Sequence, residues 1–383
     1  MKIPFNKPYI TGNELKYIET LIMSLDKGGK ISGDGEYTKK IQNLIESKFL
    51  AKKALLTTSC TSAIEMATLL LNLNRGDEVI LPSYTFVSTA NPILISGATP
   101  VFADISEDTL NIDPKKIEEK INDNTKAIYV MHYAGISCQM DEISKIAKKH
   151  GLLIVEDAAQ GVNSKYKDQY LGTIGQFGCY SFHETKNYTC GEGGAILINT
   201  EDTEIQERAE IIREKGTNRS KFFRGEIDKY NWVDIGSSYI PSDILAAFLF
   251  AQLEKIDEIQ EKRMQVYNQY FNGLQKLEEN DKLKLPTIPK YATHNAHLFY
   301  VILENEKIRN NLLKYLKEKG IHSTFHYIPL HTSPMGKKLG YAKGDLPISE
   351  SASDRLLRLP LYADMGPSEI NYVIKSICHF FNI

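Results

Sequence analysis

Residues 152–160 read LLIVEDAAQ, an apolar run that ends in two carboxylates and a polar segment. The four apolar residues from Leu152 to Val155 have no polar face, so a strand made from them must be buried on both sides. Such strands are typical of parallel sheets that helices cover on both faces. The stretch therefore predicts a central strand of an α/β fold, with Glu156 and Asp157 at its carboxyl end.

The sequence around this stretch repeats the same alternation of short apolar runs and helical patterns. Residues 61–73, for example, are apolar nearly all round, as expected of a buried helix. We predict further strands at 54–58, 78–81, 101–104, 126–131, 178–182 and 195–199, and helices at 61–73, 85–95 and 140–150. This order predicts a mainly parallel sheet flanked by helices.

The last third of the chain has a different pattern, which predicts a smaller α+β unit. Helices are expected at 202–214 and from Ser242 to about Leu274, followed by a strand at 296–303, a helix at 308–319, a strand around 324–327 and two final helices. We therefore divide the chain into a large domain, 1–253, and a small C-terminal domain, 254–383. The N-terminal segment could pack on the small domain.

Composition disfavours several classes of protein. The 383 residues carry a formal net charge of -2, so no bulk positive field favours nucleic acid as a partner. The N-terminus lacks the apolar stretch of a signal peptide, and no apolar run is long enough to span a membrane. The five cysteines form no CxxC pair, which disfavours disulfides and structural zinc and favours a reducing, cytoplasmic location.

Asp157 is the first candidate for chemistry. The carboxyl end of a buried parallel strand is where open α/β sheets bind ligands. A carboxylate at this place could pair with the ring nitrogen of pyridoxal phosphate (PLP), which must stay protonated if the ring is to accept electrons. The alternative is that Asp157 caps a following helix, and this residue alone does not decide between the two.

Residues 181–187, SFHETKN, place Lys186 just past a predicted strand and before the glycine-rich turn 191–194. Partial burial lowers the pKa of a lysine and exposes a nucleophilic amine, which a Schiff base to an aldehyde cofactor needs. A lysine after a strand is more often a solvated loop residue, so this signal is weak by itself.

Hydroxyl and aromatic side chains follow two other predicted strands. Residues 59–62, SCTS, precede a buried helix, where hydroxyls and free N–H groups suit a phosphate, although plain N-capping is the common alternative. Ser181 could add a hydroxyl. Phe86 could reach the ring of a cofactor, or could pack in the core. A phosphate cradle, an aromatic ring, a carboxylate and a lysine in this order, each near a strand end, together favour a PLP site.

These residues resemble the DegT/DnrJ/EryC1/StrS family of sugar aminotransferases, which have the PLP-dependent transferase fold of type I. The likeness covers essentially the whole chain, and its specific motifs are EDAAQGV at 156–162, SFHETKN at 181–187 and GDEVILPSYTFVSTAN at 76–91. Within the family, the likeness is greatest to the transaminases that make dTDP-4-amino-4,6-dideoxygalactose, as judged from residues 181–189, 213–225, 234–239 and 325–331.

The resemblance implies two catalytic residues. Lys186 would hold PLP as a Schiff base, and Asp157 would pair with the pyridine nitrogen. The resemblance also implies further contacts: Gln160 near the ring hydroxyl, Phe86 stacked on the ring, Thr61, Ser62 and Ser181 at the phosphate, and His326 and His331 at the substrate.

Enzymes that resemble this chain are homodimers whose sites lie at the subunit interface. In many relatives a segment like GYNYR reaches the phosphate bound by the neighbouring subunit. Here residues 236–240 read GSSYI, so Ser238 takes the place of the asparagine and Ile240 that of the arginine. Ser238 is therefore the candidate for a contact with the cofactor of the partner subunit.

The implied reaction transfers an amino group from L-glutamate to C4 of dTDP-4-keto-6-deoxy-D-glucose, giving dTDP-4-amino-4,6-dideoxy-D-galactose for a surface polysaccharide antigen. Other members of the family make the glucose-configured C4 amine or a C3 amine. A deoxysugar 3-dehydratase would, by resemblance, have a histidine in place of Lys186.

Other classes of protein remain as alternatives. A Rossmann-type nucleotide-binding protein would show GxGxxG after its first strand, and the sequence lacks it. A PLP-binding regulatory protein without turnover would share the same residues. His294 and His297, and His322 and His326, have spacings found in metal sites, but no carboxylate or cysteine cluster accompanies them, so no metal is expected.

Overall fold

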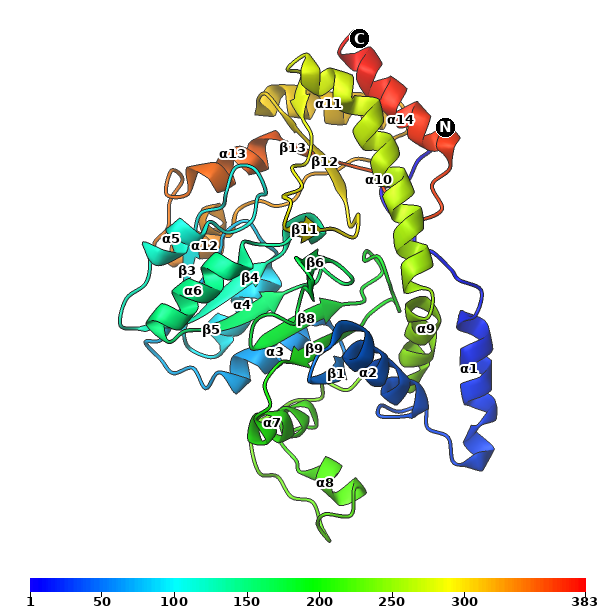
Figure 1. Cartoon of the computed structure of the whole chain (residues 1–383), viewed down its shortest axis with the longest axis vertical. Helices are drawn as coiled ribbons and strands as arrows, with labels where there is room; N and C mark the ends of the chain where they lie inside the picture. The colour runs from blue at the N-terminus through cyan, green and yellow to red at the C-terminus, as the bar shows by residue number, and fades with distance from the viewer.

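The computed structural model describes residues 1–383, and its centre is a seven-stranded sheet (Figure 1). The strand order is β1-β9-β8-β5-β4-β2-β3, which places β5, the strand made from the LIVED residues, in the middle. The strands are β1 (Lys53–Thr57), β2 (Glu78–Pro82), β3 (Thr99–Ala103), β4 (Thr125–Met131), β5 (Leu153–Asp157), β8 (Phe177–Ser181) and β9 (Gly194–Ile198).

Only β9 runs against the other strands of this sheet. β8, β5, β4, β2 and β3 pair in parallel, whereas β9 pairs antiparallel with both β8 and β1. The prediction of a mainly parallel sheet is therefore confirmed. Because parallel strands end at one edge, the residues that follow β2, β4, β5 and β8 come together there.

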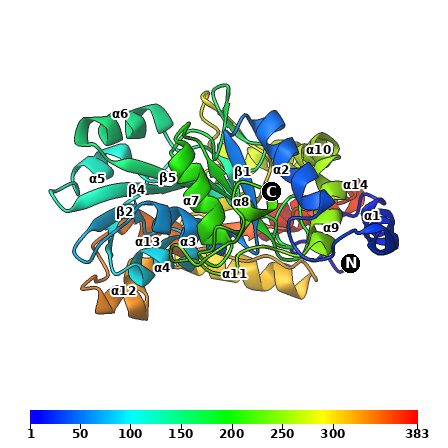
Figure 2. The same cartoon turned by 90° about the horizontal axis from the view of Figure 1, so that it is seen from below.

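Helices cover both faces of the sheet. Successive residues of each strand point to opposite sides, so the buried strands present apolar side chains on both faces. Ile154 belongs to one apolar core, shared with α2, α6 and α9, and Val155 belongs to another, shared with α3, α4 and α7. Figure 2 shows α6 on one side of the sheet and α3 and α4 on the other. These helices are α2 (Glu36–Phe49), α3 (Cys60–Leu70), α4 (Val87–Ile95), α6 (Met140–His150), α7 (Thr203–Arg213) and α9 (Asp243–Leu253).

A second, smaller unit has its own sheet and its own apolar core. It contains β10 (Leu283–Lys284), β12 (Phe299–Leu303), β13 (Leu356–Leu359), α10 (Ile256–Glu279), α11 (Glu306–Glu318), α13 (Pro347–Arg355) and α14 (Pro367–Phe380). Ile3 is fully buried in this core and pairs with Ile321, so the N-terminal segment packs on this unit. A domain boundary between residues 253 and 254 stays a prediction.

The remaining elements are short or peripheral. They are α1 (Glu14–Met23), η1 (Leu25–Lys27), α5 (Pro114–Glu118), η2 (Tyr133–Gly135), β6 (Lys165–Tyr166), β7 (Gln169–Tyr170), α8 (Arg219–Phe223), β11 (Ala292–Thr293), η3 (Leu330–Thr332) and α12 (Pro334–Lys338). Helices that combine the length and the apolar character needed to cross a membrane are absent.

The single helix predicted from Ser242 to about Leu274 is two helices. α9 ends at Leu253 and α10 begins at Ile256, because Lys255 leaves the helical conformation with φ -111° and ψ 20°. α10 begins in a core of the large sheet and continues, from Val266 onward, into the core of the small unit. The break therefore lies where the chain passes from one unit to the other.

The strand predicted around 324–327 is also wrong. Only Thr324 pairs with a strand, through an isolated bridge to Arg358 of β13. The carbonyl of His326 accepts hydrogen bonds from the hydroxyls of Tyr84 and Tyr133 instead of from a neighbouring strand. Side-chain donors thus replace the ladder that the sequence pattern suggested.

Candidate active site

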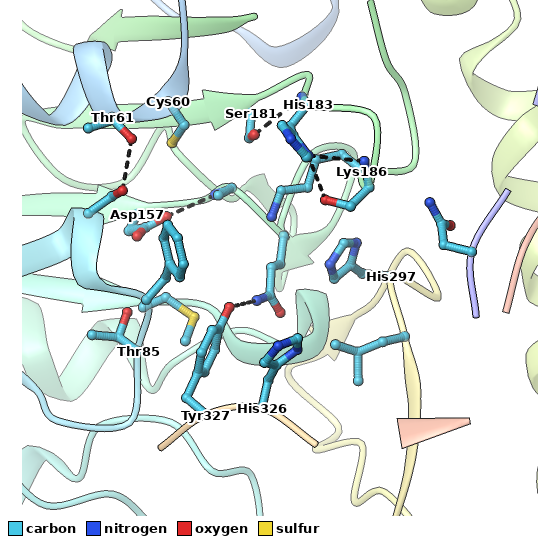
Figure 3. Close-up of a pocket in the computed structure, with 18 of the residues that line it drawn as sticks. Cys60, Thr61, Thr85, Asp157, Ser181, His183, Lys186, His297, His326 and Tyr327 are labelled. Carbon is cyan, nitrogen blue, oxygen red and sulfur yellow. Dashed lines mark hydrogen bonds between the residues drawn. The ribbon is translucent and has the colours of Figure 1, made fainter. Parts of the chain in front are cut away.

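A cavity of about 340 Å³ opens at the carboxyl end of the large sheet, against the small unit. Its walls come from the segments after β1, β2, β5 and β8, from the N-terminal segment and from β13. Figure 3 shows Thr61, Asp157, Ser181, Lys186 and Tyr327 around this cavity. A volume of this size is typical of a small-molecule site.

Asp157 is the last residue of β5 and is only 6% exposed. Its Oδ2 accepts a hydrogen bond from the Thr89 hydroxyl (2.7 Å), and its Oδ1 accepts one from the backbone N–H of Ala159 (3.1 Å). No helix begins after Asp157, so the alternative of a helix cap is wrong. Neutral donors orient the carboxylate, which leaves it able to pair with a cation that enters the cavity.

Lys186 lies in the loop between β8 and β9, and its side chain enters the cavity (Figure 3). The loop is tightly folded: the N–H of Cys190 donates to the carbonyl of Phe182 (3.0 Å), and that of Lys186 donates to His183 (2.9 Å). Burial lowers the pKa of the Lys186 amine below its usual 10.5, although the charge of Asp157 opposes this effect. No hydrogen bond contributes to the shift, so the amine is available for chemistry.

The N-terminus of α3 forms one end of the cavity. Ser59 caps this helix by accepting a hydrogen bond from the N–H of Ser62 (3.0 Å). Thr61 lines the cavity and donates to the hydroxyl of Ser88 (2.8 Å). Gly194 lies so close behind the cap that a methyl group there would overlap the backbone of Ser59. Hydroxyls and free N–H groups at a helix N-terminus suit the phosphate of a cofactor.

Of the two serines expected at the phosphate, Ser181 and Ser62, only one has a side chain that lines the cavity. Ser181, the last residue of β8, lines the cavity, whereas Ser62 does not. The Ser62 hydroxyl lies 2.8 Å from that of Thr58 and 3.0 Å from that of Ser59, within the cap itself. The expected contact of Ser62 with phosphate stays a prediction, and its side chain does not line the cavity.

Phe86 and Gln160 lie on two other walls. The side chain of Phe86 is 55% exposed, at the cavity, so the alternative of a core residue is wrong. Gln160 is held by its Oε1, which accepts a hydrogen bond from the N–H of Ala134 (2.7 Å), and its Nε2 donates to the hydroxyl of Tyr327 (2.8 Å). The rings of Phe86 and Tyr327 lie 6.3 Å apart.

The two histidines expected at the substrate have different places. His326 lines the cavity, and its Nδ1 accepts a hydrogen bond from the guanidinium of Arg358 (2.6 Å). Burial, with help from the charges of Arg358 and Lys186, lowers the pKa of His326 to about 4. His331 is fully buried behind the wall, 2.7 Å from the Ser83 hydroxyl and 2.9 Å from Glu350, and does not line the cavity. Its expected contact with the substrate stays a prediction.

Three further residues line the cavity although their place there was not predicted from the sequence, namely Arg358, Tyr327 and His297. Arg358 comes from β13, which the sequence pattern did not predict. The Nδ1 of His297 lies 3.0 Å from Oδ1 of Asn187, the neighbour of Lys186 in the SFHETKN motif. Burial lowers the pKa of His297 well below its usual 6.5, so its ring is neutral.

Ser238 lies outside the cavity of its own chain, on the exposed segment between α8 and α9. Its contact with a partner subunit stays a prediction. No group of three histidine, cysteine, aspartate or glutamate side chains is arranged to hold a metal ion.

The sequence of the chain matches known proteins over nearly its whole length. The model of the DegT/DnrJ/EryC1/StrS aminotransferase family matches residues 13–378. The spore coat polysaccharide biosynthesis protein SpsC of Bacillus subtilis is 33% identical over 385 residues, which cover 98% of this chain and 96% of that protein.

Two solved structures are similar over the full length of the chain. Spr1654 of Streptococcus pneumoniae, solved in its PLP form, superposes with a TM-score of 0.91 at 26% identity, covering 100% of this chain and 99% of the other. PseC of Helicobacter pylori, an aminotransferase involved in the biosynthesis of pseudoaminic acid, superposes with a TM-score of 0.89 at 26% identity, covering 100% of both chains.

Proposed function

Because this chain belongs to the DegT/DnrJ/EryC1/StrS aminotransferase family, we propose that it transfers an amino group from L-glutamate to C4 of dTDP-4-keto-6-deoxy-D-glucose. The chain is a PLP-dependent sugar aminotransferase of fold type I. The identity of the sugar, the amino donor and the position of the new amine belong to the proposal. The product would be dTDP-4-amino-4,6-dideoxy-D-galactose.

One observation carries the proposal: Lys186 and Asp157 line the same cavity. Lys186 offers an amine whose pKa burial lowers and which no hydrogen bond occupies. Asp157 offers a carboxylate that Thr89 and Ala159 hold in place. A nucleophilic amine and an oriented carboxylate at the end of a parallel sheet are the two groups that a PLP enzyme requires.

The rest of the cavity also fits PLP. Ser59, Thr61 and Ser181 present hydroxyls at the N-terminus of α3, where an anion is stabilised by free N–H groups. Phe86 presents an exposed ring on another wall, suited to packing on a flat heterocycle. The residues present therefore provide a partner for each part of the cofactor.

PLP supplies an aldehyde that combines with amines and a ring that accepts an electron pair. Lys186 would hold the aldehyde end and, once displaced by the donor, would move a proton as general base and acid. Its lowered pKa favours the neutral amine, which is the form that accepts a proton. Asp157 would keep a proton on the ring nitrogen through a charge-assisted hydrogen bond.

The sugar is inferred from sequence motifs at 181–189, 213–225, 234–239 and 325–331 that resemble transaminases forming the C4 galactose-configured amine. The likeness to SpsC, a spore coat polysaccharide biosynthesis protein, and to PseC, an aminotransferase involved in pseudoaminic acid biosynthesis, supports a role in surface sugars such as a polysaccharide antigen. A glucose-configured C4 amine and a C3 amine are the alternative products.

The proposal includes a homodimer with sites at the interface and a cytoplasmic location. Ser238 of each subunit would approach the phosphate bound by the other. The five cysteines form no disulfide in the structure, which suits a reducing compartment. No nucleic acid, membrane or metal partner enters the proposal.

The test is to incubate the PLP-loaded protein with dTDP-4-keto-6-deoxy-D-glucose and L-glutamate and to identify the product by proton NMR. A small coupling between the protons on C3 and C4 is expected, because an axial amine places its C4 proton equatorial. A large, diaxial coupling would indicate the glucose configuration, and nitrogen on C3 would overturn the regiochemistry. Lys186→Ala is the control, and wild-type protein that binds PLP without transferring nitrogen to any ketosugar would support a regulatory role.

A further inference from the structure

Residues His326 and Tyr327 form a wall of the cavity without belonging to a helix or a strand. They come from the segment between α11 and η3, whereas Lys186 and Asp157 come from the large sheet. Backbone hydrogen bonds to other segments hold this part of the chain at Thr324 and at Leu330, and side chains hold the wall between them.

Two tyrosine hydroxyls meet on one carbonyl. The hydroxyl of Tyr84 donates to the carbonyl oxygen of His326 (2.6 Å), and the hydroxyl of Tyr133 donates to the same oxygen (3.0 Å). Both rings are fully buried, their centroids lie 5.3 Å apart, and they lie 5.9 and 6.2 Å from the ring of Tyr327. Tyr84 follows β2 and Tyr133 follows β4, so these bonds fasten the wall to the large sheet.

The hydrogen bonds around Tyr327 have a fixed direction. The N–H of Ala134 donates to Oε1 of Gln160 (2.7 Å), which makes the other atom of that amide, 2.8 Å from the Tyr327 hydroxyl, its nitrogen (Figure 3). An amide nitrogen donates and does not accept, so the oxygen of Tyr327 is the acceptor. The proton of that hydroxyl is left without a partner in the protein.

This proton is available to a ligand. Tyr327 lines the cavity, and burial raises the pKa of its phenol above its usual range, so the group stays protonated. A phenol in this state can donate a hydrogen bond to an oxygen of a bound molecule. The sugar substrate is rich in such oxygens.

We propose that Tyr84 and Tyr133 are positioning residues that hold the His326–Tyr327 wall so that the hydroxyl of Tyr327 donates a hydrogen bond to an oxygen of the bound ketosugar. The contact with the sugar rests on the proposed function, whereas the fastening of the wall does not. Tyr84 and Tyr133 act through this wall and touch no substrate themselves.

The same aromatic cluster provides a matched control. The ring of Tyr300 lies 5.8 Å from that of Tyr133, and the Tyr300 hydroxyl is buried without any hydrogen-bond partner. Tyr300→Phe therefore removes one buried hydroxyl next to the wall without removing a bond to it. A general effect of losing a tyrosine hydroxyl from this core would appear in this variant too.

The kinetic experiment uses holoenzyme of Tyr84→Phe, Tyr133→Phe, Tyr327→Phe and Tyr300→Phe. Each half-reaction is followed by the absorbance of the cofactor, with L-glutamate in one and dTDP-4-keto-6-deoxy-D-glucose in the other. The loss of one neutral hydrogen bond predicts that Tyr327→Phe raises KM for the sugar by about twofold to tenfold. Rates of the half-reaction with glutamate should stay within about twofold of wild type. A change of this size is smaller than the effect expected from the loss of one hydrogen bond.

A double-mutant cycle tests whether the positioning residues act through Tyr327. Tyr84→Phe and Tyr133→Phe should raise KM for the sugar in the same direction, and Tyr300→Phe should not. In the double variant Tyr133→Phe/Tyr327→Phe, the increase in KM for the sugar should be smaller than the product of the increases in the two single variants. Equal losses in both half-reactions, or fully multiplicative effects, would overturn the proposal.

Hydrogen exchange of the backbone gives a second readout, which does not depend on activity. In the holoenzyme, the hydrogen-bonded amides that flank the wall, those of Thr324 and Leu330, should exchange faster in Tyr84→Phe and Tyr133→Phe than in wild type or Tyr300→Phe. Unchanged exchange there would overturn the fastening. If wild-type protein does not use this sugar, the proposed function fails, and the exchange result still decides whether the two tyrosines hold the wall.

Discussion

Lys186 has an environment unlike that of an ordinary lysine, and this difference can be measured without turnover. Because burial lowers its pKa, the neutral amine is present at lower pH than for a lysine in water. The rate at which the apoprotein takes up PLP should rise with pH and reach its midpoint below the usual 10.5. Borohydride should then fix the cofactor to Lys186, as shown by peptide mapping. An adduct on another lysine, or a midpoint at or above 10.5, would contradict the assignment.

Asp157 gives a second prediction at the scale of one residue. Asp157→Asn keeps the shape of the side chain but removes the charge that would hold a proton on the ring nitrogen. A hydrogen bond to a charged group contributes about 1.5–3 kcal/mol, so turnover should fall by roughly tenfold to a hundredfold. Steady-state kinetics measure the loss, with Asp168→Asn, an exposed carboxylate outside the cavity, as the control. Near-normal turnover in Asp157→Asn would mean that another group holds the ring.

The contact between α3 and β9 gives a prediction at the scale of elements. Gly194 begins β9 and lies against the cap of α3, so the methyl group of Gly194→Ala would push the helix N-terminus away from its place. Overpacking costs about 1–3 kcal/mol, and if this strain falls on the binding site, PLP should bind roughly fivefold to a hundredfold more weakly, as measured by fluorescence titration. Gly366→Ala is the control, because no atom lies within 3.7 Å of the added methyl group. Unchanged PLP affinity in Gly194→Ala would show that this cap does not bind the phosphate.

Local sequence patterns predicted the elements that carry Lys186 and Asp157, because those patterns are short and self-contained. The LIVED residues form a buried strand that ends in a carboxylate, and apolar runs of this kind have few other solutions. The direction of a side chain on α3 was harder to predict. Thr61 faces the cavity and Ser62 turns back to its own cap, a difference that depends on where the helix begins.

Contacts between distant segments could not be predicted from local patterns. Tyr327 and Arg358 reach the cavity only because the small unit packs against the large sheet. The residues around Thr324 look like a strand, yet the carbonyl of His326 is held by Tyr84 and Tyr133, which lie 242 and 193 residues earlier in the chain. Tertiary contacts override strand propensity in this way.

At the scale of the whole molecule, the segment 216–239 extends away from the large sheet around α8 and returns to the core at Tyr239 (Figure 1). It carries exposed apolar side chains, namely Phe222, Phe223, Tyr230, Trp232, Val233 and Ile235. Exposed apolar clusters of this kind are typical of interfaces with other proteins. Ser238, the candidate contact with the partner's cofactor, lies in the same segment. The structure therefore supports the proposal that this segment reaches the partner's site.

Trp232 is the residue through which this assembly is best tested, because it is 80% exposed in the single chain and large enough to anchor an interface. Trp232→Glu should weaken the homodimer by roughly thirtyfold or more, since loss of an interface hot spot costs about 2 kcal/mol or more. Sedimentation measures the association, and Leu50→Glu, at a residue 75% exposed and outside the segment, is the control. If segment 216–239 of one subunit completes the site of the other, activity per chain of Trp232→Glu should fall on dilution and return at high concentration. A dimer whose association is unaffected by Trp232→Glu would show that the interface lies elsewhere on the chain. A monomer with full activity would rule out shared sites.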